Sequence, residues 1–524
     1  MLSIPTMFPP LAIMTGLDYV IVVAYLLGIT ALGAMFMRGQ MTTRDYFVAG
    51  RSLGWLPVGI SVMATNFSAS SLIGSPGYVV THDLIMITRT VCFFFAIPLT
   101  IWLFLRFYHR LDVTSVYEYI GKRFDGRMRF ISSGIFLLLR GSWMATAQYA
   151  TGLALTQVLG LDLWVCVVIV GTLTTIYSAL GGIKAVIWTD VVQAALMLGA
   201  MFVTIGVCIA RVPDGAAGIW ELADTGGKLR IVDFSWSFFQ PTTQSMLIGA
   251  TFSILASYGV DQVIVQRYFT TKDYKTLVRS AYAGMLFTLP VIILTFAIGV
   301  CIYSYYMAYP TRLPEGLIGD QWFPTFIVRE LPAGITGIIV AGLLAATMSS
   351  ADSGVNSLTT VFIVDLYRPW RDARAARAGL RQVADPARTD QGELRMARWL
   401  SFGFGGAATV GAMFVGNIGT VLEISNKLNG VIGGVLLGIF LAAVLSRRTN
   451  ASGVLLGAAV GAAVIVYTSF FTGVYFMWFG VIGCLTTFFA TQLASRFFAA
   501  PDLAHLEGLT IIGSKRKDGQ SHGI

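Results

Sequence analysis

Residues 64–77 read ATNFSASSLIGSPG, and residues 253–262 read SILASYGVDQ. Both stretches lie within apolar segments long enough to cross a bilayer, yet they carry glycine and hydroxyl residues where an ordinary membrane helix carries leucine. Interrupted membrane helices expose free backbone carbonyls and amides near the bilayer midplane, and paired interruptions mark the binding sites of secondary transporters. Small residues at tight helix crossings are the alternative for either stretch alone. Because the two occur at corresponding positions, they favour a site built from two broken helices.

Further apolar segments lie on either side of these two and predict an all-α polytopic membrane protein. The chain has 524 residues, of which 56% are hydrophobic and 12% charged, a composition that indicates a protein that lies in lipid. Because the interrupted segments are the second and seventh spans and so lie five helices apart, an odd number, helices 2–6 and 7–11 are predicted to form two repeats of opposite orientation, with one helix before them and two after. The segments that span the hydrocarbon core predict about thirteen transmembrane helices, at 17–37, 54–80, 85–107, 129–158, 162–181, 188–210, 244–266, 279–307, 334–362, 396–416, 421–446, 452–472 and 474–495.

The basic residues orient this arrangement in the membrane. Most of the 36 Lys and Arg residues fall in loops on one side, and the positive-inside rule places that side in the cytoplasm. We therefore expect a multi-pass protein of the cell membrane with its N-terminus outside and its C-terminus inside. The predicted regions are the outer N-terminus (1–16), the first helix and a cytoplasmic loop (17–53), repeat 1 (54–210), an outer loop (211–243), repeat 2 (244–446, with an Arg-rich cytoplasmic loop at 366–395), the last two helices (447–496) and a cytoplasmic tail (497–524).

Motifs of other functional classes are missing from the sequence. The net charge of +9 follows from the cytoplasmic loops, so no nucleic-acid partner is expected. The five cysteines and four histidines show no metal-ligand spacing. No ATP-binding, dinucleotide-binding or nucleophile motif occurs, so the sequence predicts neither an enzyme nor an ATP-driven pump. An ion gradient is the remaining source of energy, and no obligatory protein partner is inferred.

A third polar motif, AATMSSADS at 345–353, lies in the ninth predicted helix. Ser349 and Ser353 are four residues apart and so share one helix face. Hydroxyl oxygens on one face, together with a carbonyl freed by a nearby helix break, are the hard ligands that Na+ prefers. Serines also join helices in membrane bundles without binding an ion. The density of polar residues, with Asp352 among them, favours an ion site.

Three further charged residues lie at or within predicted spans. Asp190, near the start of the sixth span, is a second cation ligand or a proton-titratable group, or else the helix is capped by Asp190 or Thr189. Arg89 and Arg140 lie away from the basic loops, and each needs an anionic partner in the membrane. That partner is either a substrate carboxylate or an internal acid or carbonyl.

At these residues the chain resembles the sodium:solute symporter family, from about Leu17 to Phe489. The resemblance implies the leucine-transporter fold, a 5+5 inverted repeat with one extra helix before it and two after, in which Na+ binds between the second and ninth helices. The matching blocks are DYFVAGR (45–51), TSVYEY (114–119), KRF (122–124), YSALGGIKAVIWTD (177–190), DQ (261–262), QR (266–267) and the residues from 349 to 356.

The resemblance also implies ligands for Na+. A second site, present in some members, corresponds to Asp190, Ser349, Asp352 and Ser353. Asp352 stands where those members tend to have a hydroxyl residue, so the expected cofactor is Na+, as one ion or two. The sodium site typical of the family falls on the carbonyls of Ala64, Phe67 and Ala346 and the hydroxyls of Ser349 and Ser350.

For the solute, the resemblance implies a cavity between the broken helices, beside which Arg89 and Arg140 could meet a carboxylate. The matching blocks look most like the branch that carries sialic acid, monocarboxylates, vitamins or iodide, and the polar residues of sugar-carrying members are missing. The implied function is Na+-coupled symport of a small organic anion. The alternatives are a neutral solute, such as an amino acid or a sugar, or a non-transporting sensor. The implied cavity residues are Ser68, Ser71, Thr90, Trp143 and Tyr258.

Overall fold

The computed structural model describes residues 14–36, 42–378, 386–415 and 421–511. Within these ranges the regular structure is helical, and one isolated backbone bridge joins Leu53 to Thr271. The predicted all-α class is therefore confirmed. The first half of the chain forms α1 (Gly16–Met35), α2 (Thr43–Val48), α3 (Trp55–Asn66), α4 (Ala69–Thr81), α5 (Phe93–Thr100), α6 (Arg106–Leu111), α7 (Val116–Arg123), α8 (Gly126–Leu159), α9 (Leu163–Arg211) and α10 (Gly215–Thr225).

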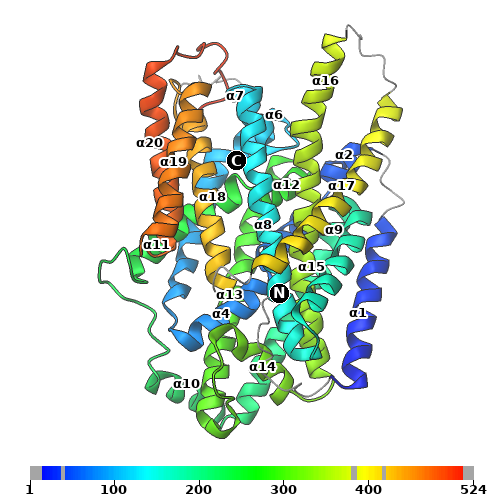
Figure 1. Ribbon diagram of the computed structural model, residues 1–524, viewed down its shortest axis with the longest axis vertical. Helices are drawn as coiled ribbons and strands as arrows, with labels where there is room; N and C mark the ends of the chain where they lie inside the picture. The colour runs from blue at the N-terminus through cyan, green and yellow to red at the C-terminus, as the bar shows by residue number, and fades with distance from the viewer. Residues whose placement is uncertain (1–13, 37–41, 379–385, 416–420, 512–524) are drawn as a thin grey trace.

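The second half is also a succession of helices, shown in green to red in Figure 1. Its last two long helices, α19 and α20, lie side by side on one flank of the molecule, whereas α1 lies on the opposite flank. These elements are α11 (Thr243–Gly259), α12 (Gln262–Phe269), α13 (Tyr274–Ala308), α14 (Trp322–Glu330), α15 (Ile335–Val361), α16 (Arg368–Arg377), α17 (Pro386–Val415), α18 (Val421–Leu445), α19 (Ala451–Phe471) and α20 (Met477–Ala494).

Many of these helices can cross a membrane. In the described part of the chain, eight helical segments are long and apolar enough, and two bent helix pairs raise the number to ten if each pair is one span. The bent pairs are α3 with α4, at 57°, and α11 with α12, at 50°. They coincide with the two interrupted stretches of the sequence, so the prediction that these two spans are broken helices is confirmed.

One predicted boundary differs in the structure. The sequence suggests separate spans at 162–181 and 188–210, but α9 runs through both and is broken at Gly182, where φ is 54° and ψ is 175°. Glycine adopts this positive φ because it has no side chain to clash with the backbone. Asp190 therefore lies inside a helix rather than at its start, and the Thr189 hydroxyl donates to the Ala185 carbonyl one turn back. The helix-cap interpretation of Asp190 and Thr189 is wrong.

Helix α15 lies against both the first broken helix and the kinked helix. It contacts α1, α3, α8 and α9, and 89% of its most apolar stretch is buried inside the protein. Small residues allow this close approach, because a side chain on Gly342 would come within 2.9 Å of the Ala200 methyl group of α9. The polar motif of the ninth predicted span is thereby held inside the protein, away from lipid.

Candidate functional site

The break between α3 and α4 exposes backbone groups inside the protein. The helix ends at Asn66, and Phe67 and Ser68 adopt extended backbone angles before α4 begins. The Asn66 side-chain amide donates to the Val62 carbonyl at 3.2 Å, a local bond of the kind that competes with regular helix formation. The break therefore leaves carbonyls near the end of α3 available to groups on other helices.

Two serines of α15 reach these carbonyls. The Ser349 hydroxyl donates to the Ala64 carbonyl at 2.9 Å, and the Ser350 hydroxyl donates to the Thr65 carbonyl at 3.4 Å. Both serines are fully buried, as is Ala346 one turn earlier. The structure thus brings together Ala64, Ser349 and Ser350 of the first implied sodium site. Their neutral oxygen donors fit a dehydrated monovalent cation.

The second implied sodium site holds a protein cation. Asp190 lies in α9 and accepts, through Oδ2, hydrogen bonds from the hydroxyls of Ser61 at 2.5 Å and Thr65 at 3.3 Å. The same oxygen accepts from Nη2 of Arg267 at 3.1 Å. Ser353 is also a hydrogen-bond partner of Arg267. Arg267 belongs to the QR block (266–267) of the family resemblance, but no local feature of that block predicts that its guanidinium lies at this site.

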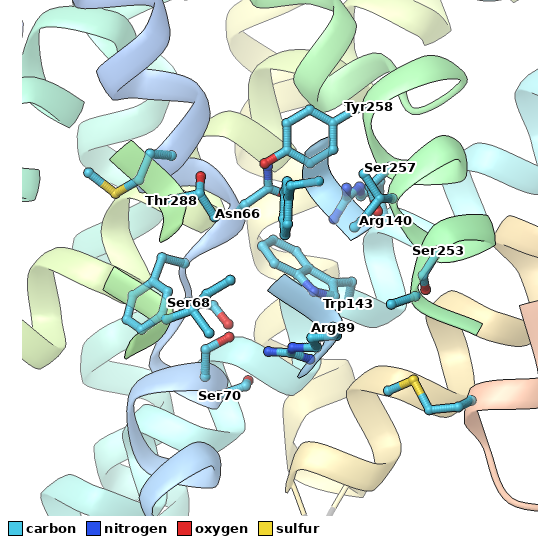
Figure 2. A pocket seen from close by; sticks show the side chains of 18 residues that line it. Asn66, Ser68, Ser70, Arg89, Arg140, Trp143, Ser253, Ser257, Tyr258 and Thr288 are labelled. Atoms are coloured by element: carbon cyan, nitrogen blue, oxygen red, sulfur yellow. The ribbon is translucent and has the colours of Figure 1, made fainter. Parts of the chain in front are cut away.

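A cavity of about 170 Å³ lies between the two broken helices and is shown in Figure 2. Residues of both breaks line it, together with residues of α8, α13 and the 3-10 helix Ile85–Cys92. Met477, at the start of α20, also lines it, although that helix lies outside the predicted repeats. Six predicted solute-site residues are in the lining: Ser68, Ser71, Arg89, Arg140, Trp143 and Tyr258.

Arg140 has an internal partner. It donates to both carboxylate oxygens of Asp261, through Nε at 3.1 Å and through Nη2. Its guanidinium also lies 4.6 Å from the centre of the Trp143 ring. Asp261 caps α12 by accepting the Val263 amide at 3.0 Å, so the carboxylate is fixed at the second break. The sequence left two kinds of partner open for Arg140, a substrate carboxylate or a group of the protein, and the structure supplies an internal acid.

Arg89 differs from Arg140, since the described residues offer it neither a hydrogen bond nor an ion pair. It is half-buried, and its guanidinium carbon lies 6.0 Å from the centre of the Phe296 ring. Figure 2 shows its guanidinium directed into the cavity, on the side of Ser68 and Ser70. A cation in this position can receive an anionic ligand.

Thr90, the seventh residue implied for the solute site, is not among the residues that line this cavity. Its hydroxyl donates to the Ile87 carbonyl at 2.7 Å, a bond within its own helix. The segment Ile85–Cys92 is a 3-10 helix, which has three residues per turn, so an α-helical register does not hold there. As a result Arg89, and not Thr90, faces the cavity.

A polytopic helical protein with two broken helices around a polar cavity has the architecture of a secondary transporter. The chain matches the family described as "Sodium:solute symporter family" over residues 46–461, and it belongs to that family. The predictions of a multi-pass transporter, of Na+-coupled symport and of a small-molecule solute are thereby confirmed.

Individual relatives agree with this membership. The chain is 30% identical to "Sodium/sialic acid symporter NanT" of Aliivibrio fischeri, over 92% of this chain and 93% of the relative. It is 30% identical to "Sodium-dependent multivitamin transporter" of Oryctolagus cuniculus, over 87% and 71% of the two chains. A solved structure titled as a substrate-bound, outward-open Na+-coupled sialic acid symporter superposes with a TM-score of 0.84 at 27% identity, covering 93% of this chain and 99% of the other.

Proposed function

We propose that this protein takes up a small organic anion together with Na+ by alternating access. The observation that carries the proposal is Arg89, a cavity cation for which the described residues offer no anionic partner. A guanidinium pairs bidentately with a carboxylate, and an unpaired charge inside a membrane protein is costly. A carboxylate solute therefore satisfies a group that the protein leaves unsatisfied. The names of the sialic acid and multivitamin transporters among its relatives agree with an anionic solute.

The size of the cavity narrows the class of solute. A cavity of about 170 Å³ is only slightly larger than an engineered cavity of ~150 Å³ that holds one benzene molecule. In this conformation a compact monocarboxylate suits the site better than a sugar acid does. Trp143 and Ile254 supply apolar walls, while Ser68 and Ser257 supply hydroxyls for orientation.

For Na+ we assign the first implied site, made by the carbonyls of Ala64, Phe67 and Ala346 and the hydroxyls of Ser349 and Ser350. When bound, the ion adds positive charge beside the cavity and draws the end of α3 toward α15. Asn66, next to these carbonyls, lines the cavity, so the ion site and the solute site share the same helix break. This shared break provides the physical coupling between the two ligands.

The membrane arrangement is part of the proposal. We place thirteen transmembrane helices in a 5+5 inverted repeat, with the region boundaries given by the sequence, the N-terminus outside and the C-terminus in the cytoplasm. The protein acts alone in the cell membrane and does not chemically alter its solute. Accessibility of single cysteines tests the orientation: a cysteine at Gln244, which follows the predicted outer loop, should react from outside, and one at Trp370, in the predicted cytoplasmic loop, should react from inside.

A thermal-shift screen of the purified protein tests the proposed function. Pyruvate, pantothenate and N-acetylneuraminate are compared with glucose and proline, each in NaCl and in choline chloride. A ligand that binds the folded state raises the unfolding temperature. We expect stabilisation by an acid only when Na+ is present, followed by Na+-dependent counterflow of that acid in proteoliposomes. Stabilisation by a neutral solute alone would contradict the anionic class, and binding without counterflow would indicate a sensor.

A further inference from the structure

The loop 226–242 joins α10 to α11 at the edge of the molecule (Figure 1). The structure describes all of its residues, and none of them belongs to a helix or strand. Near the start of the loop, Arg230 donates from Nε to Oδ2 of Asp83 at 2.7 Å. The Lys228 ammonium donates to the Val80 carbonyl at 2.6 Å. The first part of the loop is thus bound to the end of α4, the second half of the first broken helix.

Asp83 connects this contact to the helix that carries Arg89. The Asp83 side chain is buried, and its Oδ1 accepts the amide of Ile85 at 3.0 Å. Ile85 is the first residue of the 3-10 helix Ile85–Cys92, whose Arg89 lines the cavity. One carboxylate oxygen of Asp83 therefore holds the start of that helix, while the other accepts from Arg230 on the loop.

The last part of the loop holds the start of α20. The Phe238 carbonyl accepts the backbone amide of Tyr475 at 2.8 Å, and the Ser237 carbonyl accepts the indole N–H of Trp478 at 3.3 Å. The rings of Phe238 and Trp478 also pack together, with their centres 5.0 Å apart. Met477 lies between the two bound positions in the sequence and lines the cavity. The loop therefore contacts two elements that each contribute a residue to the cavity wall.

We propose that the loop 226–242 fixes two walls of the solute cavity from outside the membrane, with Arg230 as a positioning residue for Arg89. The inference rests on the proposed function, in which Arg89 binds the carboxylate of the solute. Bidentate pairing of a guanidinium with a carboxylate has a strict geometry, so the affinity depends on where the helix that carries Arg89 is held. Groups already held in the bound arrangement lose less conformational entropy when the solute binds. The loop thereby raises the affinity for the solute, although none of its described residues lines the cavity.

Hydrogen exchange of the purified full-length protein tests the positioning role without a solute. Arg230→Gln removes the ion pair with Asp83, so the amides of residues 85–92 are expected to exchange about threefold faster than in the wild type. Arg312→Gln is the matched control, because the Arg312 side chain is 53% exposed in its ion pair with the buried Glu330, much as the Arg230 side chain is 50% exposed in its own. Neither of these two control residues lines the cavity. Unchanged exchange in Arg230→Gln, or equal acceleration in the control, would overturn the positioning role.

Uptake by proteoliposomes tests whether the loop acts through Arg89. The probe is the radiolabelled acid, among pyruvate, pantothenate and N-acetylneuraminate, that stabilises the protein in the thermal-shift screen. Arg230→Gln is expected to raise KM for this acid about threefold with kcat and Na+ dependence unchanged, and Arg230→Lys to restore it. In an Arg89→Gln background, Arg230→Gln is expected to have no further effect on KM. If Arg230→Gln does not fold, Asp83→Asn replaces it, because the amide oxygen still accepts the Ile85 N–H while the charge that holds Arg230 is lost.

The outcomes separate this inference from the proposed function. An unchanged KM in Arg89→Gln would overturn the proposed role of Arg89 in binding the solute. A raised KM in Arg89→Gln with an unchanged KM in Arg230→Gln would overturn the positioning role alone, as would effects of the two substitutions that multiply in the double variant.

Discussion

The two broken helices bend by similar angles, 57° between α3 and α4 and 50° between α11 and α12, but they contribute different chemistry. The first break contributes neutral oxygens, such as the Ala64 carbonyl that the Ser349 hydroxyl reaches. The second break lies between ionised groups that already have partners, Asp261 with Arg140 and, on α12, Arg267 with Asp190. The first break is thus suited to bind an ion or a solute, whereas at the second break the charged side chains are held in ion pairs within the protein.

The largest expected effect follows from breaking the ion pair at the second helix break. Asp261→Asn keeps the cap on α12, because an amide oxygen still accepts the Val263 N–H, but it leaves Arg140 buried without a counter-charge. Removing one partner of a buried ion pair destabilises a protein by about 3–5 kcal/mol. Denaturant titration of the purified variant in detergent measures this loss of unfolding free energy.

A double variant controls for the charge itself. Arg140→Gln combined with Asp261→Asn removes both charges, and we expect it to recover a substantial part of the lost stability. If Asp261→Asn were as stable as the wild type, the ion pair between Arg140 and Asp261 would not stabilise the second break. The two breaks would then not differ in the way proposed.

The next largest effect concerns the cavity arginine whose partner we take to be the solute. Arg89→Gln removes a charge-assisted hydrogen-bond donor worth about 1.5–3 kcal/mol, so KM for the transported acid is expected to rise about 10–100-fold. Radiotracer uptake measures it, with Arg279→Gln, an exposed arginine outside the cavity, as the matched control. An unchanged KM for the acid would mean that Arg89 does not bind it.

A smaller effect is expected at the first break. Ser349→Ala removes one neutral ligand and its hydrogen bond to Ala64, worth about 1 kcal/mol, so the Na+ concentration for half-maximal uptake should rise about fivefold. Ser357→Ala is the control, because that serine lies two turns further along α15 and donates to the Gly354 carbonyl within its own helix. Equal Na+ dependence in both variants would contradict the placement of the ion.

The sequence predicted the elements whose signals are local. Glycine, serine and proline within apolar spans indicated both breaks, and the helical spacing of Ser349 and Ser353 indicated the polar face of α15. The sequence did not predict which side chains of distant segments form ion pairs. Arg140 and Asp261 are 121 residues apart and Arg267 and Asp190 are 77 apart, and only the packing of the helices decides which acid meets which base. The sequence also did not predict that the segment around Arg89 forms a 3-10 helix, because this segment packs against α11, which is distant in the sequence.

The smallest effect tests that register. The family resemblance implies Thr90 as a cavity residue, whereas in the structure its hydroxyl donates to the Ile87 carbonyl and Arg89 lines the cavity. Thr90→Val replaces the hydroxyl with a methyl group of similar size and removes only the side-chain bond to the Ile87 carbonyl, which the backbone of the 3-10 helix still engages. We expect stability to change by no more than ~0.5 kcal/mol and KM for the acid to change less than about twofold. A tenfold loss of affinity for the acid, with Na+ dependence unchanged, would place Thr90 in the solute site and shift the register by one residue. The fixed charges of the second break would then have to orient a solute held by hydroxyls rather than by a free guanidinium.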